Sequence, residues 1–331
     1  MKVNGIYTIR DVSHPYYWDI IYEWEDIFSN VFDAPLIPVG KDYDEIYRPS
    51  FFRKILNRIN YYQIRDRYFL RPTGYYLAFH IGPPGVYSFH SRMNVIPIII
   101  DFWGTENTQR FEKIFYKSPA VVVSSKQVYN YLKSKRINLN LLHLPLSLPD
   151  KYMLPDLGSD REIDVVQMGR QNSQLAQFME QLMKEHPEIH YVWAENRGGV
   201  YSMISNKNGN LGKFSGRESF MGLLRRSKVS LLSAPGVDQD FSRTGGFSPV
   251  TPRFLESAAC GCHLIGIYPN NDDFNEYGIA EFCKTFQTYH EFRNLILESL
   301  DSKHPATNNS FLQNHLTSKR AGELKQQLES L

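Results

Sequence analysis

The chain has 331 residues, a length that predicts two domains, and its 42% apolar and 14% aromatic content excludes disorder for most of it. There are 37 Lys and Arg against 35 Asp and Glu, so the net charge of +2 predicts no global affinity for polyanions, and nucleic acid is not an expected partner. An odd number of cysteines, three, indicates no disulfide framework and favours a reducing cytoplasm. The N-terminus carries no secretion signal, and Pro97 and Asp101 interrupt the most apolar run, so we expect no membrane span.

Strand-like and helix-like patterns alternate through the first 144 residues. Such alternation predicts a parallel sheet covered by helices. The predicted strands are Val3–Ile9, Tyr75–His80, Ile96–Ile100, Val121–Ser124 and Leu141–Leu144, and the predicted helices cover 17–31 and Lys126–Lys135.

A proline-spaced connector follows, with Pro145, Pro149 and Pro155 before Gly158, and it places a domain boundary near 150–158. A second alternating series then has strands Ile163–Gly169, Tyr191–Ala194, Val229–Leu232 and His263–Ile267, and helices Ser173–Glu185, Glu218–Arg226 and Pro252–Cys260. We therefore predict an α/β fold with domains at 1–152 and 153–307, followed by a helix-prone segment at 308–331 whose packing the sequence leaves open. Two doubly wound halves place a ligand in the cleft between them, at the carboxyl ends of the strands.

Residues 242–266 are the most informative stretch. Thr251 is suited to cap a helix, Pro252 to its first position and Gly261 to the left-handed residue that ends it. The helix N-terminus would directly follow a glycine-rich loop, where free N–H groups and the helix dipole favour an anion such as phosphate.

Arg253 and Glu256 lie three residues apart on this predicted helix. One interpretation is that Arg253 reaches a phosphate while Glu256 accepts hydrogen bonds from sugar hydroxyls. The alternative is an ordinary capped helix with a surface Arg–Glu pair.

Four segments together resemble the group 1 glycosyltransferases (family 4-like, CgeB-like) of the GT-B fold. TPRFLESAACG at 251–261 is similar to their nucleotide-sugar-binding helix, and 121–152 resembles the end of their first domain. DVVQMGR at 164–170 resembles the first strand of their donor domain, and 218–235 the helix and strand before the donor loop. The resemblance implies two Rossmann-like domains facing each other across a cleft, with the acceptor side in the first and the donor in the second.

The resemblance also assigns roles to individual residues. Arg170 matches the family arginine that contacts the donor diphosphate, and Glu256 matches the second acid of the Glu-x7-Glu pattern, which binds the nucleotide ribose. The helix terminus at Thr251 would help to hold the diphosphate and stabilise it as it leaves, without an obligatory metal or other cofactor.

The chain departs from the family pattern at two places. The first acid of the pattern falls on Ser248, and the usual lysine falls on Leu175 or Ala176. Arg243 and Arg253 are the nearest cations that could replace the lysine, because a diphosphate in a low-dielectric site needs opposite charge.

Three residues after predicted strands of the first domain are candidates for acceptor chemistry: His14, His80 and Asp101. Loops at the carboxyl ends of parallel strands face a ligand site, where His or Asp could position or deprotonate a hydroxyl. For each histidine the alternative, a structural residue with its hydrogen bonds satisfied, is the more common role. Asp101 ends an apolar strand, where an unpaired carboxylate would be costly to bury.

Residues 48–71 carry seven Arg or Lys among aromatic residues, with one Asp. A helix of this pattern suits an anionic membrane surface, although a helix packed on its own domain would show the same pattern. RNA binding is disfavoured because no recognised RNA motif accompanies the segment.

The sequence thus predicts a cytoplasmic or peripheral inner-membrane transferase. It would move a sugar from a nucleotide-diphosphate sugar to a glycan or lipid-linked acceptor, in bacterial surface polysaccharide or glycoconjugate synthesis, and we expect the anomeric configuration to be retained. One alternative is a non-catalytic nucleotide-sugar or glycan-binding module of the same fold. Another is a metal-dependent transferase that uses Asp238 and Asp240, an Asp-x-Asp pair of a kind expected about once by chance.

Overall fold

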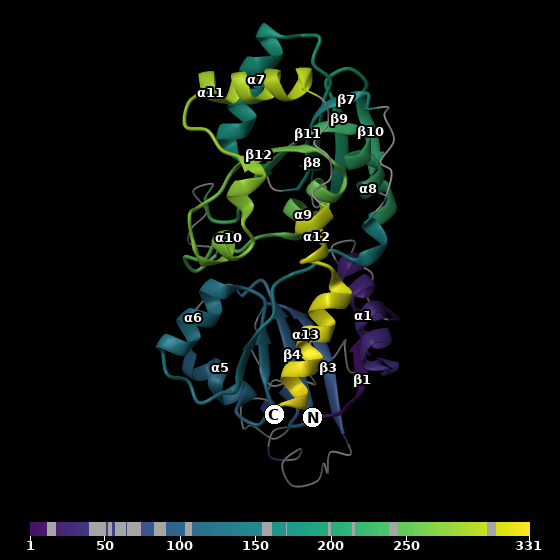
Figure 1. Cartoon of the computed structure of the whole chain (residues 1–331), viewed down its shortest axis with the longest axis vertical. Coiled ribbons are helices and arrows are strands. Elements are labelled where there is room, and N and C mark those ends of the chain that lie inside the picture. Colours follow the sequence, from purple (N-terminus) through teal and green to yellow (C-terminus); the bar gives the residue numbers. More distant parts are fainter. Residues whose placement is uncertain are drawn as a thin grey trace. The chain divides into compact units, whose positions relative to one another are not determined.

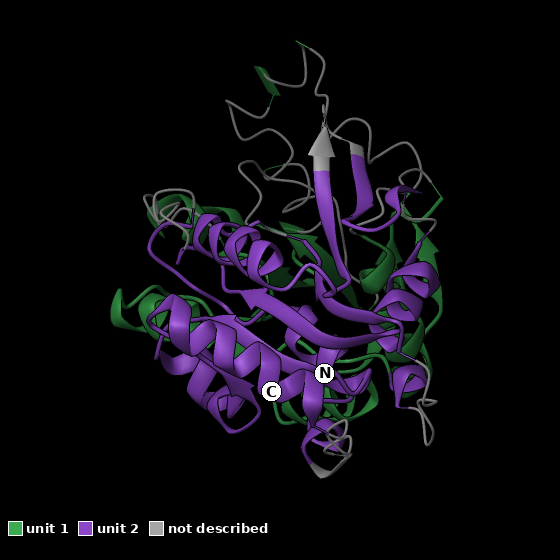
Figure 2. Ribbon diagram, turned by 90° about the horizontal axis from the view of Figure 1, so that it is seen from above, with its two compact units in different colours: residues 1–149, 317–331 green, residues 150–316 purple. Residues whose placement is uncertain are grey.

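A computed structural model divides the chain into two compact units. Unit 1 comprises Met1–Pro149 and Thr317–Leu331, and unit 2 comprises Asp150–Leu316 (Figure 2). The structure describes residues 1–11, 18–39, 51, 55–56, 64, 74–82, 91–102, 108–153, 161–169, 171–197, 200–213, 216–237, 244–302 and 309–331.

The described part of unit 1 forms a six-stranded parallel sheet in the order β2-β1-β3-β4-β5-β6 (Figure 1). Its strands are β1 (Val3–Thr8), β2 (Leu36–Pro38), β3 (Tyr75–Ile81), β4 (Val95–Ile100), β5 (Val121–Val123) and β6 (Leu141–His143). Its helices are α1 (Asp19–Phe32), α5 (Thr108–Phe115), α6 (Lys126–Ser134) and α13 (Thr317–Glu329). All six residues of β4 are buried. A strand that is covered on both faces of a parallel sheet needs apolar residues throughout, and β4 accordingly contains the most apolar run of the chain.

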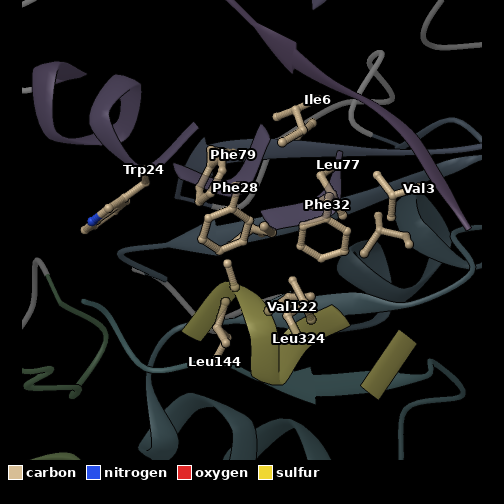
Figure 3. Packing of buried hydrophobic residues seen from close by; sticks show 14 of the residues in the cluster. Val3, Ile6, Trp24, Phe28, Phe32, Leu77, Phe79, Val122, Leu144 and Leu324 are labelled. Carbon is tan, nitrogen blue, oxygen red and sulfur yellow. The ribbon is translucent and has the colours of Figure 1, made fainter. Parts of the chain in front are cut away.

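The core of unit 1 lies between this sheet and two helices. Trp24, Phe28 and Phe32 of α1 recur at helical spacing and face the sheet, where the Phe28 ring meets Phe79 edge-on at 5.1 Å (Figure 3). Leu324 of α13 joins the same cluster beside Val122. Unit 1 is therefore built from residues at both ends of the sequence.

The C-terminal helix α13 packs against α1, which answers the question that the sequence left open (Figure 1). At its first residue, the Thr317 N–H donates to the Leu148 carbonyl at 2.9 Å, and the Thr317 hydroxyl meets that of Ser147 at 2.9 Å. Farther along, the Lys325 ammonium donates to the Val31 carbonyl at 3.0 Å.

The described part of unit 2 holds a seven-stranded sheet in the order β10-β9-β8-β7-β11-β12-β13. Its strands are β7 (Ile163–Gln167), β8 (Tyr191–Arg197), β9 (Val200–Ser205), β10 (Gly209–Lys213), β11 (Ser227–Ser233), β12 (His263–Ile267) and β13 (Cys283–Lys284). Its helices are α7 (Ser173–Glu185), α8 (Arg217–Arg225), α9 (Pro252–Ala259), α10 (Asp272–Glu276), α11 (Tyr289–Asp301) and α12 (Asn309–Gln313). The five strands β7, β8, β11, β12 and β13 are parallel, and β9 and β10 extend the sheet antiparallel beyond β8.

Each strand and helix named in the sequence analysis appears in the structure with shifts of a few residues at its ends, except the helix considered at 48–71, most of which lies outside the described residues. The antiparallel extension of β9 and β10 was not predicted. Its outer strand β10 is exposed along its whole length, so it lacks the alternation of apolar and polar residues that marks a half-buried strand.

One ionisable side chain, Glu25, lies in the buried face of α1. Its Oε2 accepts hydrogen bonds from the Thr8 hydroxyl at 2.5 Å and from the Arg10 guanidinium at 3.2 Å. Burial nevertheless raises the pKa of Glu25 from 4.5 to about 7, because loss of water disfavours the ionised form more than these partners favour it.

We expect Glu25 to make unit 1 less stable as the pH rises. Because the folded-state pKa is the higher one, the stabilising contribution is complete below pH 4.5 and is lost as the pH passes through about 7. At about 1.4 kcal/mol for each unit of pKa, the free energy of unfolding should fall by roughly 3 kcal/mol. Urea unfolding at pH 5 to 8 should show this slope in the wild type and lose it in Glu25→Gln. The exposed control Glu329→Gln should keep it, and equal slopes in all three proteins would contradict the assignment.

Candidate functional site

In unit 2 the order of the strands reverses at β7. The chain passes from β7 to β8 on one side of the sheet and later to β11 on the other. Ligands of doubly wound sheets bind beyond the carboxyl ends of the strands at such a reversal. We call the region formed by the loops after β7 and β11 the switch point.

The two loops of the switch point are joined by a side-chain hydrogen bond. The Asn172 amide, in the loop after β7, donates to the hydroxyl of Ser233, the last residue of β11, at 3.2 Å. The Asn172 carbonyl oxygen also caps α7, accepting from the backbone N–H groups of Gln174 at 2.9 Å and Leu175 at 3.2 Å. The N-terminus of α7 is thereby fixed at the switch point.

Helix α9 follows the loop that leaves β11, and it begins and ends as the sequence predicted. Thr251 occupies the N-cap position with extended backbone angles, Pro252 is the first helical residue, and Gly261 turns the chain with a φ of 66°. The Thr251 side chain, however, makes no capping hydrogen bond. In the first turn, Pro252 has no N–H group and the Phe254 N–H donates to the Thr251 backbone carbonyl at 3.2 Å.

Arg253 lies in the first turn of α9, and its guanidinium lies directly over Gly169 at the end of β7. A Cβ added at Gly169 would overlap the guanidinium carbon and nitrogens, and the φ of Gly169 is +93°, a conformation that side chains disfavour. The sequence predicted a strand closing in Gly-Arg. The structure shows that this glycine makes room for a cation at the switch point.

Glu256 lies one turn farther along α9 and points inward, with 2% of its surface exposed. Its Oε1 is bound by the Arg217 guanidinium at 2.6 Å. The expected alternative of a surface pair with Arg253 is therefore wrong, because the partner comes from α8 and the pair is buried. Sequence reasoning missed Arg217, which is 39 residues from its partner and looks like a solvated residue at a helix start.

Ser248 and Leu175 stand where the family pattern has an acid and a lysine, and both residues have structural roles in unit 2. The Ser248 hydroxyl is buried and donates to the Pro235 carbonyl, while its own carbonyl accepts from the Asn271 amide at 3.0 Å. Leu175 is fully buried in the core of unit 2, and Ala176 is exposed. Neither position of α7 supplies a cation.

Several predicted site residues lie outside the described residues: His14, Arg170, Asp238, Asp240, Arg243 and most of 48–71. Over the ranges that the structure does describe, no group of three or more His, Cys, Asp and Glu could hold a metal ion. No helix in those ranges is long and apolar enough to cross a membrane.

In unit 1, His80 and Asp101 lie at the ends of the neighbouring strands β3 and β4. His80 is buried, its Nδ1 donates to the Gly82 carbonyl, and burial lowers the pKa of the imidazole, so it stays neutral near pH 7. Asp101 is half-buried and has a φ of 53°, which is unusual for a residue with a side chain. The two candidates are thus near in the fold but differ in access to a ligand.

Known proteins resemble this chain in structure only. A scan against models of protein families and a search of curated proteins find no match. A Listeria monocytogenes protein assigned as a UDP-N-acetylglucosamine 2-epimerase is 9% identical, with a TM-score of 0.53 over 100% of this chain and 96% of that one.

Two further structures have lower TM-scores. The pneumococcal O-GlcNAc transferase GtfA, solved with UDP and GlcNAc, is 13% identical with a TM-score of 0.47, and 72% of this chain matches 53% of that one. This chain thus spans about half the length of GtfA. The glycotransferase of kitacinnamycin is 10% identical with a TM-score of 0.46 over 98% of both chains.

The predicted fold class is confirmed. The chain is an α/β protein of two Rossmann-like units that matches structures of the GT-B fold. The described sheet of unit 1 is parallel, and that of unit 2 is mixed. At these identities the likeness concerns the fold, and function must be argued from the site.

We expect Gly169→Ala to destabilise unit 2 by about 1–3 kcal/mol, chiefly because its φ of +93° disfavours a side chain, with a smaller steric part because the flexible end of Arg253 must move aside. Adding Arg253→Ala should recover the steric part of that loss and leave the backbone part. Gly222→Ala is the matched control, since a Cβ there meets nothing within 4 Å and alanine favours the helix. Urea unfolding of the wild type, Gly169→Ala, Arg253→Ala, the double variant and the Gly222→Ala control would measure the coupling. Strictly additive effects of Gly169→Ala and Arg253→Ala would show that the two residues do not share this space.

Proposed function

We propose that the protein is a glycosyltransferase that binds a nucleotide-diphosphate sugar at the switch point of unit 2 and transfers its sugar to a glycan or lipid-linked acceptor. The observation that supports this most is the Arg253 guanidinium over Gly169, at the start of a helix whose N-cap side chain makes no capping hydrogen bond. This arrangement places a cation and the positive end of a helix dipole together at the carboxyl end of β7, where a diphosphate is bound best.

In this proposal the diphosphate is held by Arg253 and the N-terminus of α9, with Arg170 and Arg243 assigned by the family resemblance. The bond to the sugar breaks as negative charge collects on the departing diphosphate. Fixed cations and N–H dipoles stabilise that charge without reorganising, which lowers the barrier and makes a metal dispensable.

Glu256 is assigned to the nucleotide ribose. A carboxylate has about four acceptor sites, so Oε1 can be bound by Arg217 while Oε2 accepts from ribose hydroxyls. The donor sugar would be recognised without a carboxylate at position 248, because the residue there is Ser248. Its hydroxyl donates to the Pro235 carbonyl.

Unit 1 is assigned to the acceptor. Asp101 is the better candidate to contact an acceptor hydroxyl, because it is half-buried at the end of β4, whereas Nδ1 of His80 already donates to the Gly82 carbonyl. His14 stays a candidate on sequence grounds alone. If transfer retains the anomeric configuration, positioning by these residues suffices and no strong base is needed.

One assay separates the proposed activity from its rivals. Purified protein is incubated with UDP-, GDP-, ADP- and CMP-sugars, and release of the nucleotide is followed together with the stereochemistry of the recovered sugar. Nucleotide release supports a transferase, and binding without turnover indicates the non-catalytic module. Inversion at C2 of the sugar would indicate an epimerase, an activity named for the Listeria protein of similar fold. Loss of activity with a chelator and recovery with manganese would indicate a metal-dependent transferase that uses Asp238 and Asp240.

We expect Glu256→Ala to weaken binding of the selected nucleotide sugar by about one to three kcal/mol, the usual scale for a hydrogen bond to a charged group. Titration calorimetry measures the affinity, and thermal unfolding confirms that the variant is folded. Glu298→Ala, an exposed glutamate of the same unit, is the control. Equal affinities in wild type and Glu256→Ala would remove Glu256 from the site.

Peripheral attachment to a membrane is supported by three exposed apolar side chains within the basic stretch 48–71. Phe51 is 81% exposed, Ile55 43% and Ile64 51%. Side chains of this size insert into the acyl region of a bilayer while neighbouring basic residues meet anionic headgroups. We therefore assign this stretch to peripheral attachment.

The protein should bind vesicles that contain anionic lipid at low salt, bind less as salt rises, and ignore neutral vesicles. Replacing Phe51, Ile55 and Ile64 together by serine should abolish sedimentation with the vesicles. Leu211→Ser, at an exposed leucine on β10, should leave it unchanged. Absence of binding to anionic vesicles at low salt would exclude the attachment.

A further inference from the structure

The buried ion pair between α8 and α9 suggests a role for a residue that no motif assigns. Arg217 is the first residue of α8, and its Nη1 lies 2.6 Å from Oε1 of Glu256 in the second turn of α9. The Arg217 side chain is 14% exposed and that of Glu256 is 3% exposed. At this distance and burial the two charges form one hydrogen-bonded unit.

Aromatic rings hold the Arg217 guanidinium in place. It lies 5.4 Å from the centre of the buried Tyr152 ring and 5.6 Å from that of Phe220, within the range of cation–π attraction. A planar guanidinium can stack on rings and bind a carboxylate edge at the same time, whereas an ammonium has no such plane. Tyr152 and Phe220 therefore fix Arg217, and Arg217 fixes one edge of Glu256.

Fixing Glu256 has two consequences for a bound nucleotide. The carboxylate is already oriented by Arg217 before the ligand arrives, so binding does not have to order it. Because Oε1 is already bound by Arg217, Oε2 is the oxygen left to accept hydrogen bonds from a ligand, and its orientation is fixed. A pair of ribose hydroxyls fits such a carboxylate edge, and a sugar lacking one of them would leave a buried acceptor unsatisfied.

We propose that Arg217 is the positioning residue that aims Glu256 at the ribose and so makes the site select ribonucleotides over deoxyribonucleotides. This inference rests on the proposed function, since it takes the nucleotide to bind at the switch point. The rival explanation is that the pair only fastens α8 to α9.

The test compares affinities for UDP, GDP and ADP with those for their 2′-deoxy and 3′-deoxy counterparts, measured by calorimetry. Wild type should prefer a ribonucleotide by tenfold or more. Arg217→Ala should lose most of this preference, and Arg217→Lys should fall between them because it keeps the charge without the planar fork. Arg226→Ala, at an exposed arginine that ends the same helix and pairs with Glu162, should behave as wild type.

A purely structural pair would lower ribonucleotide and deoxyribonucleotide affinities in parallel and leave their ratio unchanged, which would overturn the inference. A wild type that binds these nucleotides without preferring the ribose would overturn it too, while leaving the proposed function intact. Failure to bind any of the nucleotides would overturn both. If Arg217→Ala does not fold, Arg217→Lys and Glu256→Gln give the same comparison, and both should reduce the ratio.

Discussion

The switch point depends on one close approach, between the first turn of α9 and the end of β7. The Arg253 guanidinium occupies the space that a Cβ would take at Gly169. The glycine therefore serves two purposes at once, since it turns the strand with a positive φ and lets a cation reach the strand end. The proposed role of Arg253 in holding a diphosphate follows from that contact, because the contact fixes where the guanidinium charge lies relative to the helix N-terminus.

The two sheets use their carboxyl ends differently. In unit 2 the reversal carries Arg253, Asn172 and a helix start, all of which favour an anion. In unit 1 the corresponding end carries carboxylates, with Glu25 bound to Thr8 beside β1 and Asp101 after β4. In the proposed function a diphosphate and a neutral hydroxyl acceptor need opposite surroundings, and the side chains at the carboxyl ends of the two sheets differ in charge in that sense.

The sequence predicted local features well and tertiary pairings poorly. Continuous apolar runs such as Ile96–Ile100 identify buried parallel strands, and the order Thr251, Pro252, Gly261 identifies both ends of α9, because these signals act between near neighbours. The polar strand β10 gives no periodic signal, since neither of its faces is buried. Arg217 was missed for a related reason: only the fold brings it to Glu256, and a lone arginine before a helix resembles many surface residues.

The return of α13 to unit 1 has a consequence for biosynthesis. Unit 2 is encoded between the two segments that form unit 1, so the buried Leu324 and Leu328 leave the ribosome only after the whole of unit 2 has been made. Until then the apolar surface that they cover beside α1 has no partner within the nascent chain. Unit 2 can complete its core first, whereas unit 1, although most of it is synthesised earlier, can complete its core only after α13 has been made.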